Sequence, residues 1–218
     1  DYSTDGIGYW SIMAGGSWGS NGARPSYFDA WCKYQLGFVE PTNIISNQLD
    51  VAIATSYYNP VLYRVWQDGI VGQQYFLVEN RRKIGYDINA PGSGLIIYHV
   101  DESMWSNDDE WHRLVNVEQA DGRYDLENDV NNGDGSDPWG TETATHFDDL
   151  SVPNSRAYSG AQTLVAVWNI SDVDSMMYAN FDIDYSHARF TMTDMAIDDN
   201  AGGDGDGTFE PGETIELT

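Results

Sequence analysis

Apolar residues recur at alternate positions or in short runs over the greater part of this chain, a pattern typical of β-strands. Leu49, Val51 and Ile53 occupy every second position of one such segment. Further apolar runs predict strands over residues 61–66, 75–79, 95–100, 164–168, 176–183 and 188–192. Turn signals such as Asn59-Pro60 and Asp68-Gly69 separate these runs at hairpin spacing, so the sequence predicts an antiparallel sheet.

One segment before these strands has helical periodicity. Its apolar residues recur at positions i, i+3, i+4 and i+7: Tyr27, Ala30, Trp31 and Tyr34. Ser26 is the expected N-cap, with Asp29 three residues later, and Gly37 and Pro41 supply stop signals. The chain is therefore expected to be α+β and mostly β, with one helix of about three turns followed by antiparallel sheet.

The N-terminal 22 residues are rich in Gly and Ser and read as loop and turn. Their densest part is Gly8-Tyr9-Trp10-Ser11-Ile12-Met13-Ala14-Gly15-Gly16. Gly15 and Gly16 permit a positive φ angle or a close approach of two backbone segments. We expect a tight turn with Met13 buried beneath it. On this pattern alone, an ordinary structural turn without a functional role is also a valid interpretation.

Composition and charge limit the classes of function. The 218 residues suffice for one sizeable domain or one and a half, and no run of about 18 apolar residues could span a membrane. A net charge of −25 excludes nucleic acid as a partner, because that contact needs clustered Lys and Arg. Cys32 is the only cysteine, so no internal disulfide can form, and its helical position predicts a buried residue.

Much of the acidity lies in two loops rich in Asp, Asn and Gly, and hard cations such as Ca²⁺ prefer such oxygen ligands. The candidate calcium ligands of the first loop, residues 121–137, are Asp125, Glu127, Asp129, Asn131, Asp134 and Asp137. Those of the second loop, residues 198–213, are Asp204, Asp206, Glu210 and Glu213. The alternative interpretation is that these are solvated acidic loops without a bound cation. The first loop does not follow the EF-hand sequence pattern.

The spacing of the histidines shows whether the sequence contains a zinc-binding motif. None of the four histidines belongs to an H-E-x-x-H helix, so this chain cannot form that zinc site by itself. His99, Asp101 and Glu102 lie together at a predicted strand end, where they could bind metal or shuttle protons. We favour a supporting role for these three. Arg81 and Arg82, near Glu79, are expected to form structural ion pairs.

Several motifs agree in order and approximate spacing with one family. Besides the turn of residues 8–18 they are Asp29-Ala30-Trp31, Gln35-Leu36-Gly37, Glu79-Asn80-Arg81, Gly85-Tyr86-Asp87, Pro91-Gly92-Ser93-Gly94-Leu95, His99-Val100-Asp101-Glu102 and the run from Glu118 to Asp125. The chain resembles the immune inhibitor A-like family of secreted bacterial zinc metallopeptidases, which are metzincin-like. The likeness covers most of residues 1–160 and begins just after the position of that family's zinc-binding helix.

The resemblance implies part of a secreted, extracellular endopeptidase that hydrolyses a protein or peptide substrate with a zinc-activated water. The zinc ligands would belong to a catalytic segment upstream of this chain. The residues implied to support the metal from below form the Met-turn: Trp10, Ser11, Met13, Gly15 and Gly16.

The resemblance also suggests three divisions of the chain. Residues 1–160 would complete a catalytic domain, residues 161–195 would form a β-rich extension, and residues 196–218 would begin an appended calcium-binding β-sandwich module that continues downstream. The main alternative is a non-catalytic, calcium-stabilised β-rich module that binds glycan or protein through exposed Trp and Tyr side chains. A structural or adhesive surface protein is a third class, but the sequence has no tandem repeats to favour it.

Overall fold

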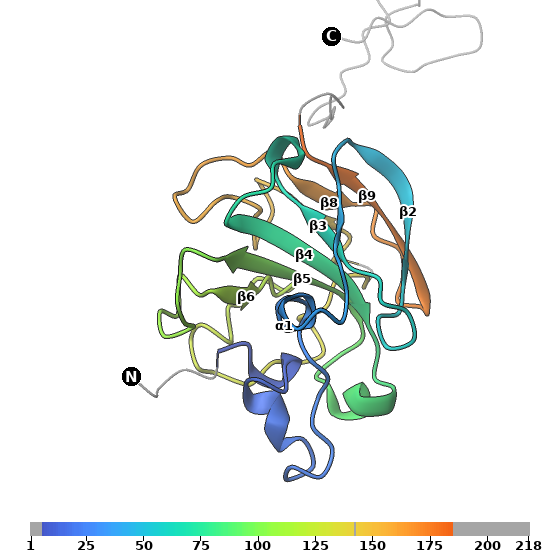
Figure 1. The fold of residues 1–218 in the computed structure, drawn as a ribbon, viewed down its shortest axis with the longest axis vertical. Coiled ribbons are helices and arrows are strands. Elements are labelled where there is room, and N and C mark those ends of the chain that lie inside the picture. The colour runs from blue at the N-terminus through green and yellow to red at the C-terminus, as the bar shows by residue number, and fades with distance from the viewer. Residues whose placement is uncertain (1–5, 142, 185–218) are drawn as a thin grey trace, which may run out of the picture. The chain divides into compact units, whose positions relative to one another are not determined.

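The computed structural model describes residues 6–141 and 143–184, in which two β-sheets form most of the regular structure (Figure 1). The first sheet has the order β1 (Thr42–Asn43), β3 (Tyr63–Val65), β4 (Gln74–Arg81), β5 (Gly94–Asp101) and β6 (Val115–Val117). The second has the order β2 (Gln48–Ala54), β9 (Met176–Asp182), β8 (Ala166–Trp168) and β7 (His146–Phe147). The described residues include one α-helix, α1 (Ala30–Gln35), and four 3-10 turns, η1 (Gly8–Trp10), η2 (Gly15–Trp18), η3 (Gln67–Gly69) and η4 (Gly85–Asn89). This part of the chain is therefore mostly β, as the sequence predicted.

Strands β4 and β5 form the centre of the molecule, and both faces of this antiparallel pair are covered. One face packs against the second sheet through Phe76, Val78, Leu95 and Ile97. The other face packs against the N-terminal turns and α1 through Tyr75, Leu77, Ile96 and Tyr98. The first sheet thus lies between two other layers, and α1 crosses in front of it in Figure 1.

The strands predicted near residues 49–53, 61–66, 75–79, 95–100, 164–168 and 176–183 are confirmed, with small differences at their ends. β8 and β9 pair antiparallel across the expected turn at residues 169–172. Strands β1, β6 and β7, each of two or three residues, were not predicted, because they do not lie in a longer apolar run as β3 and β8 do. β1 pairs parallel with β3, which departs from the antiparallel expectation. The strand expected over residues 188–192 lies outside the described residues.

Helix α1 is shorter than the predicted three turns, and its N-cap is Asp29 rather than Ser26. The Asp29 side chain accepts a hydrogen bond from the Cys32 N–H at 2.8 Å. Ser26 is buried and its N–H donates to the Gly16 carbonyl at 2.8 Å, which holds this stretch against the N-terminal turn. Gly37 follows the helix at φ +71°, in agreement with the predicted stop.

Residues 161–184 belong to the same compact unit as the N-terminal part of the chain, since that unit extends from Asp1 to His187. The pairing of β2 with β9 crosses the division predicted at residue 160, and the two strands lie side by side in Figure 1. The module expected from residue 196 lies outside the described residues.

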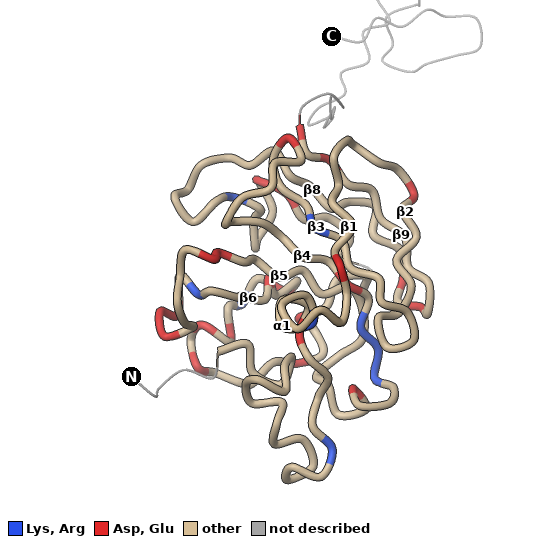
Figure 2. Tube along the Cα trace, viewed as in Figure 1, with Lys and Arg blue, Asp and Glu red and all other residues tan. Residues whose placement is uncertain are grey.

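Charged residues are distributed unevenly. Asp and Glu mark many of the loops in Figure 2, whereas Lys and Arg occur at few positions. Lys33, Arg64, Arg81 and Arg113 are buried, so four of the ten cationic side chains lie inside the fold. Within the described part of the chain, no helix is both long and apolar enough to cross a membrane.

Candidate functional site

The N-terminal turn that the sequence singled out is held from beneath by a hydroxyl group. Ser11 is fully buried, and its Oγ donates to Asp29 Oδ2 at 2.5 Å. The same oxygen accepts the Met13 N–H at 3.0 Å, so one side chain fixes both the turn and the start of α1. The Ile12 N–H donates to the Tyr27 carbonyl at 3.2 Å, which ties the turn to the chain before the helix.

Glycine is required in this turn because other backbone segments approach it closely. A Cβ atom on Gly16 would lie 2.4 Å from the Ser11 carbonyl oxygen. One on Gly8, which has φ +54°, would lie 2.3 Å from the Asn132 carbonyl oxygen. One on Gly15 would lie 2.9 Å from Asn132 Oδ1. The predicted close approach of another backbone segment is therefore confirmed at Gly16 and also occurs at Gly8, whereas the nearest atom at Gly15 belongs to the Asn132 side chain.

The expectation that Met13 is buried was wrong. Its side chain is 70% exposed, and Trp18 at the end of the same turn is 72% exposed. The interior positions are taken by Trp10, which is fully buried, and by the hydrogen-bonded Ser11. Met13 consequently projects from a turn whose backbone is fixed on the opposite side.

A buried guanidinium extends this support. Arg81 Nε donates to Asp87 Oδ2 at 3.0 Å, and Arg81 Nη1 donates to the Trp10 carbonyl oxygen. Asp87 Oδ1 also accepts the Tyr27 N–H at 2.8 Å. Burial by itself would lower the pKa of Arg81, but Asp87 and neighbouring groups raise it well above its ordinary value. The predicted ion pair of Arg81 is confirmed with Asp87 as its partner, while Glu79 pairs with Lys33.

The first acidic loop packs directly on this turn, a contact that the sequence did not predict. The Tyr9 N–H donates to the Asn132 carbonyl at 2.8 Å. The indole Nε1 of Trp10 donates to Asp137 Oδ2, also at 2.8 Å. Burial raises the pKa of Asp137 to about 7, although the Trp10 hydrogen bond acts in the opposite direction. The order of the acidic loop and the position of the turn are therefore coupled.

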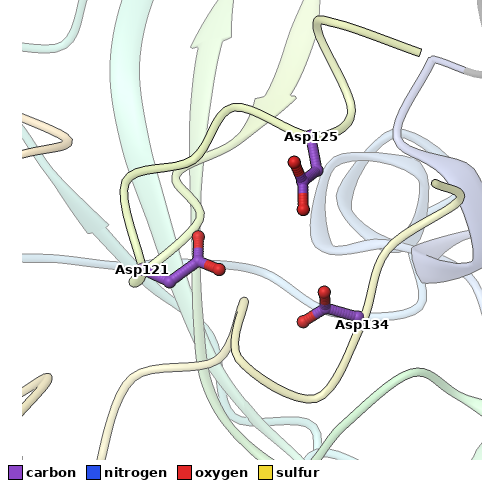
Figure 3. Close-up of side chains that lie close together, drawn as sticks. All are labelled: Asp121, Asp125 and Asp134. Carbon is purple, nitrogen blue, oxygen red and sulfur yellow. The ribbon is translucent and has the colours of Figure 1, made fainter. Parts of the chain in front are cut away.

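Three carboxylates of this loop converge: Asp121, Asp125 and Asp134 (Figure 3). One oxygen from each lies within 4.8 Å of the others, and all three residues are half-buried. The Asn131 amide donates to Asp125 Oδ2 at 3.1 Å and to Asp134 Oδ2 at 3.2 Å. Hydrogen bonds from Ser136 are the main cause of a lowered pKa at Asp134. These hydrogen bonds favour the charged carboxylate form of Asp134.

The structure separates the predicted calcium ligands into two groups. Asp125 and Asp134 join the carboxylate triad, whereas Asp121 was within the acidic run but not among the candidates. Asn131 bridges the triad through its amide. The remaining candidates of this loop face elsewhere: Glu127 accepts from Asn116 and Gln119, Asp129 is exposed, and Asp137 contacts Trp10. Asp204, Asp206, Glu210 and Glu213 lie outside the described residues.

The strand-end motif does not form one site. His99 Nδ1 lies 3.2 Å from Glu118 Oε1, and its ring stacks on Tyr158 with centroids 4.2 Å apart. Asp101 Oδ2 lies 2.8 Å from His112 Nε2. Glu102 faces the helix instead, since its Oε1 accepts hydrogen bonds from Trp31, Gln35 and Tyr75. These contacts join loops and α1 to the first sheet.

The donor atoms of these clusters decide which metal each could hold. Among residues 6–141 and 143–184, the Asp121, Asp125 and Asp134 triad is the one group of three potential ligands that converge. Its donors are all carboxylate oxygens, which suit Ca²⁺ or Mg²⁺, whereas protein zinc sites include His or Cys ligands. His99, His112 and His146 pair separately with Glu118, Asp101 and Asp148. The described residues therefore do not fit a catalytic zinc ion.

The sequence was also compared with known proteins. No protein-family model matches this chain, and no curated protein sequence matches it.

Proposed function

We propose that this chain is the C-terminal part of the catalytic domain of a secreted zinc endopeptidase, with the zinc ligands contributed by an upstream segment. The sequence resemblance motivates the proposal. The observation that carries it is the form of the Gly8 to Trp18 turn, whose backbone is fixed from the interior while Met13 and Trp18 project outward. In this proposal the exposed Met13 would become buried beneath the metal centre once the upstream segment packs on the turn.

The exposure of Met13 and Trp18 also favours a covering segment. Fully burying a methionine side chain contributes about 1.5–3 kcal/mol, so two large apolar side chains in solvent forgo a substantial stabilisation. Because Ser11, Asp29 and Arg81 already hold the turn, a segment packed on Met13 would meet a preformed surface. A segment carrying the zinc ligands is the covering element that the proposal requires.

Calcium has a structural role in this proposal. Asp121, Asp125 and Asp134 would bind Ca²⁺ and thereby order the acidic loop. That loop contacts the turn through Asn132 and through the Trp10–Asp137 hydrogen bond. Calcium would in this way keep the surface around Met13 in place without taking part in the chemistry.

The test uses the longer protein that this proposal requires. An H-E-x-x-H motif is expected within about 20 residues upstream of Asp1, and the protein should hydrolyse casein in a chelator-sensitive manner. The 218-residue chain alone should be inactive. Met13→Ala should lower kcat, whereas Met176→Ala, a matched change at another exposed methionine, should not. An upstream sequence without the motif, or chelator-sensitive hydrolysis by the isolated chain, would overturn the proposal.

One observation favours the alternative of a binding module. Trp105 is 99% exposed and Trp111 is 60% exposed on the loop between β5 and β6. Exposed tryptophans of this kind bind glycan rings or protein surfaces. If Trp105→Ala abolished the binding of a glycan or protein while the longer protein proved inactive on casein, the binding module would replace the endopeptidase.

A further inference from the structure

A small pocket opens beside α1, between the helix and the segment that joins β2 to β3. Its volume is about 170 Å³. Lys33 and Glu79 are its buried charged residues, and its walls include Tyr27, Tyr57 and Leu62. The pocket thus combines aromatic and aliphatic wall residues with polar groups and one buried ion pair.

The ion pair retains hydrogen-bonding capacity. Lys33 Nζ donates to Glu79 Oε2, and Glu79 Oε1 accepts the Tyr98 hydroxyl at 3.0 Å. An ammonium group has three N–H donors, and the bond to Glu79 is the one hydrogen bond of Lys33 Nζ within the described residues. Lys33 Nζ also lies over the Tyr27 ring, 5.2 Å from its centroid, in a cation–π contact. Burial is the main cause that lowers the pKa of Lys33. A guest with an acceptor atom would satisfy a donor that the protein leaves unused.

The volume of the pocket limits its ligand to about the size of a single ring. Pockets for drug-sized ligands have volumes of about 300–1,000 Å³, whereas a cavity of about 150 Å³ accepts benzene. The aromatic lining favours a ring over an aliphatic chain, because ring edges and faces attract each other. Tyr57 and Tyr58 already pack edge to face in this wall, with centroids 4.8 Å apart. Tyr58 and Phe38 are exposed at the rim, so a guest can enter from solvent.

The charges within the pocket select a neutral polar group. Lys33 and Glu79 balance each other, so a guest of either charge would meet one partner of like sign at close range. A hydroxyl group can accept from an ammonium and donate to a carboxylate at the same time. An aromatic ring with one hydroxyl combines the size, the stacking surface and the polar group that the pocket accommodates.

We propose that this pocket binds a single neutral phenol ring, of the kind carried by the side chain of tyrosine. The ring packs against the walls that Tyr57 and Leu62 contribute, beside the contacting pair of Tyr27 and Tyr57 rings, and the hydroxyl contacts Lys33 and Glu79. The site is independent of the endopeptidase proposal, because every residue it uses belongs to this chain and binding can be measured without any catalysis.

The test compares p-cresol, which reproduces the tyrosine side chain, with toluene, which lacks the hydroxyl. Each compound is titrated into the 218-residue chain, and binding is followed by changes in the NMR spectrum. p-Cresol should bind saturably with a dissociation constant in the millimolar range, as expected for so few atoms. Toluene should bind at least about tenfold more weakly, because it makes no hydrogen bond to the ion pair.

Two matched variants locate the site. Ser56→Phe places a ring in the pocket from its partly exposed wall and should abolish p-cresol binding. Ser159→Phe makes the same change at an exposed position outside the pocket and should preserve it. Lys33→Met should reduce the preference for p-cresol over toluene to about twofold or less, and Ser56→Phe provides the test if that variant does not fold. Absence of saturable binding, equal affinities for the two compounds in the unmodified chain, or equal effects of the two Ser→Phe changes would overturn the proposal.

Discussion

Replacing Asp134 with Asn should remove the stabilisation of this protein by calcium. The three oxygens of Asp121, Asp125 and Asp134 lie within 4.8 Å of one another, so each pair of negative charges repels by about 0.9 kcal/mol even in bulk water. A cation between them replaces this repulsion with attraction. For a dissociation constant of roughly 10⁻⁴ to 10⁻³ M, 10 mM calcium stabilises the folded chain by about 1.4–2.7 kcal/mol. In a protein of this size that free energy corresponds to a rise in Tm of about 3–10 °C.

The assay is thermal unfolding in calcium, in magnesium and in chelator at matched ionic strength. Magnesium should raise the Tm less than calcium, since it requires near-ideal octahedral geometry and dehydrates reluctantly. Asp134→Asn should lose most of the calcium shift. Asp129→Asn removes the same charge from the same loop, but Asp129 is exposed and outside the triad, so it should retain the shift.

Two results would refute this reasoning. Equal shifts with calcium and magnesium would mean that the ions merely screen a chain of net charge −25. Equal loss of the calcium shift in Asp134→Asn and Asp129→Asn would mean that the loop responds to its total charge rather than to the geometry of the triad. The acidity would then be explained by solvation alone.

Three further predictions concern packing, pH and reactivity. Met13→Ala should change the free energy of unfolding by less than about 0.5 kcal/mol because Met13 is exposed, whereas Trp10→Ala should lower it by about 3–5 kcal/mol because Trp10 is buried. Urea denaturation measures both values, and similar losses of stability in the two variants would refute the orientation of the turn. The pKa of Asp148 is lowered from its ordinary value of 3.8 to about 2, mainly by a hydrogen bond with His146. Asp148 therefore stabilises the fold above about pH 4, and this stabilisation is lost as the pH falls toward 2. Asp148→Asn should therefore be less stable than the unmodified chain in urea at pH 7 and should differ less from it at pH 2; a constant difference would contradict this. Burial, followed by the charge of Asp29, raises the pKa of the Cys32 thiol, so a disulfide reagent at pH 8 should label the folded chain at least about tenfold more slowly than the chain in urea, and equal rates would show an accessible thiolate.

Local pattern was enough to predict the principal strands of this protein. The apolar runs that became β4, β5 and β9 are long enough for their periodicity to be read, and the turn at residues 169–172 was recognisable from its residue types. The end of α1 at Gly37 was likewise fixed by the tolerance of glycine for positive φ. Such features depend on the conformational preferences of adjacent residues, which the sequence contains directly.

The beginning of α1 shows where local signals compete. Ser26 and Asp29 are both good N-cap residues, and sequence alone ranked Ser26 first. The distant turn decided between them, because Ser26 bonds the Gly16 carbonyl and Ser11 fixes the carboxylate of Asp29. A choice between two competent caps was thus made by residues about ten to twenty positions away.

The candidate sites depended even more on long-range contacts. The sequence by itself determined that this is a mostly β chain with an acidic, oxygen-rich loop and a turn requiring glycine. Only the tertiary structure decided that Met13 faces outward, that Asp121 joins Asp125 and Asp134, and that Asp137 contacts Trp10 across 127 positions of sequence. The physical reason is that side-chain direction and ligand convergence follow from how separate loops pack on β4 and β5, and spacing along the chain carries no record of that packing.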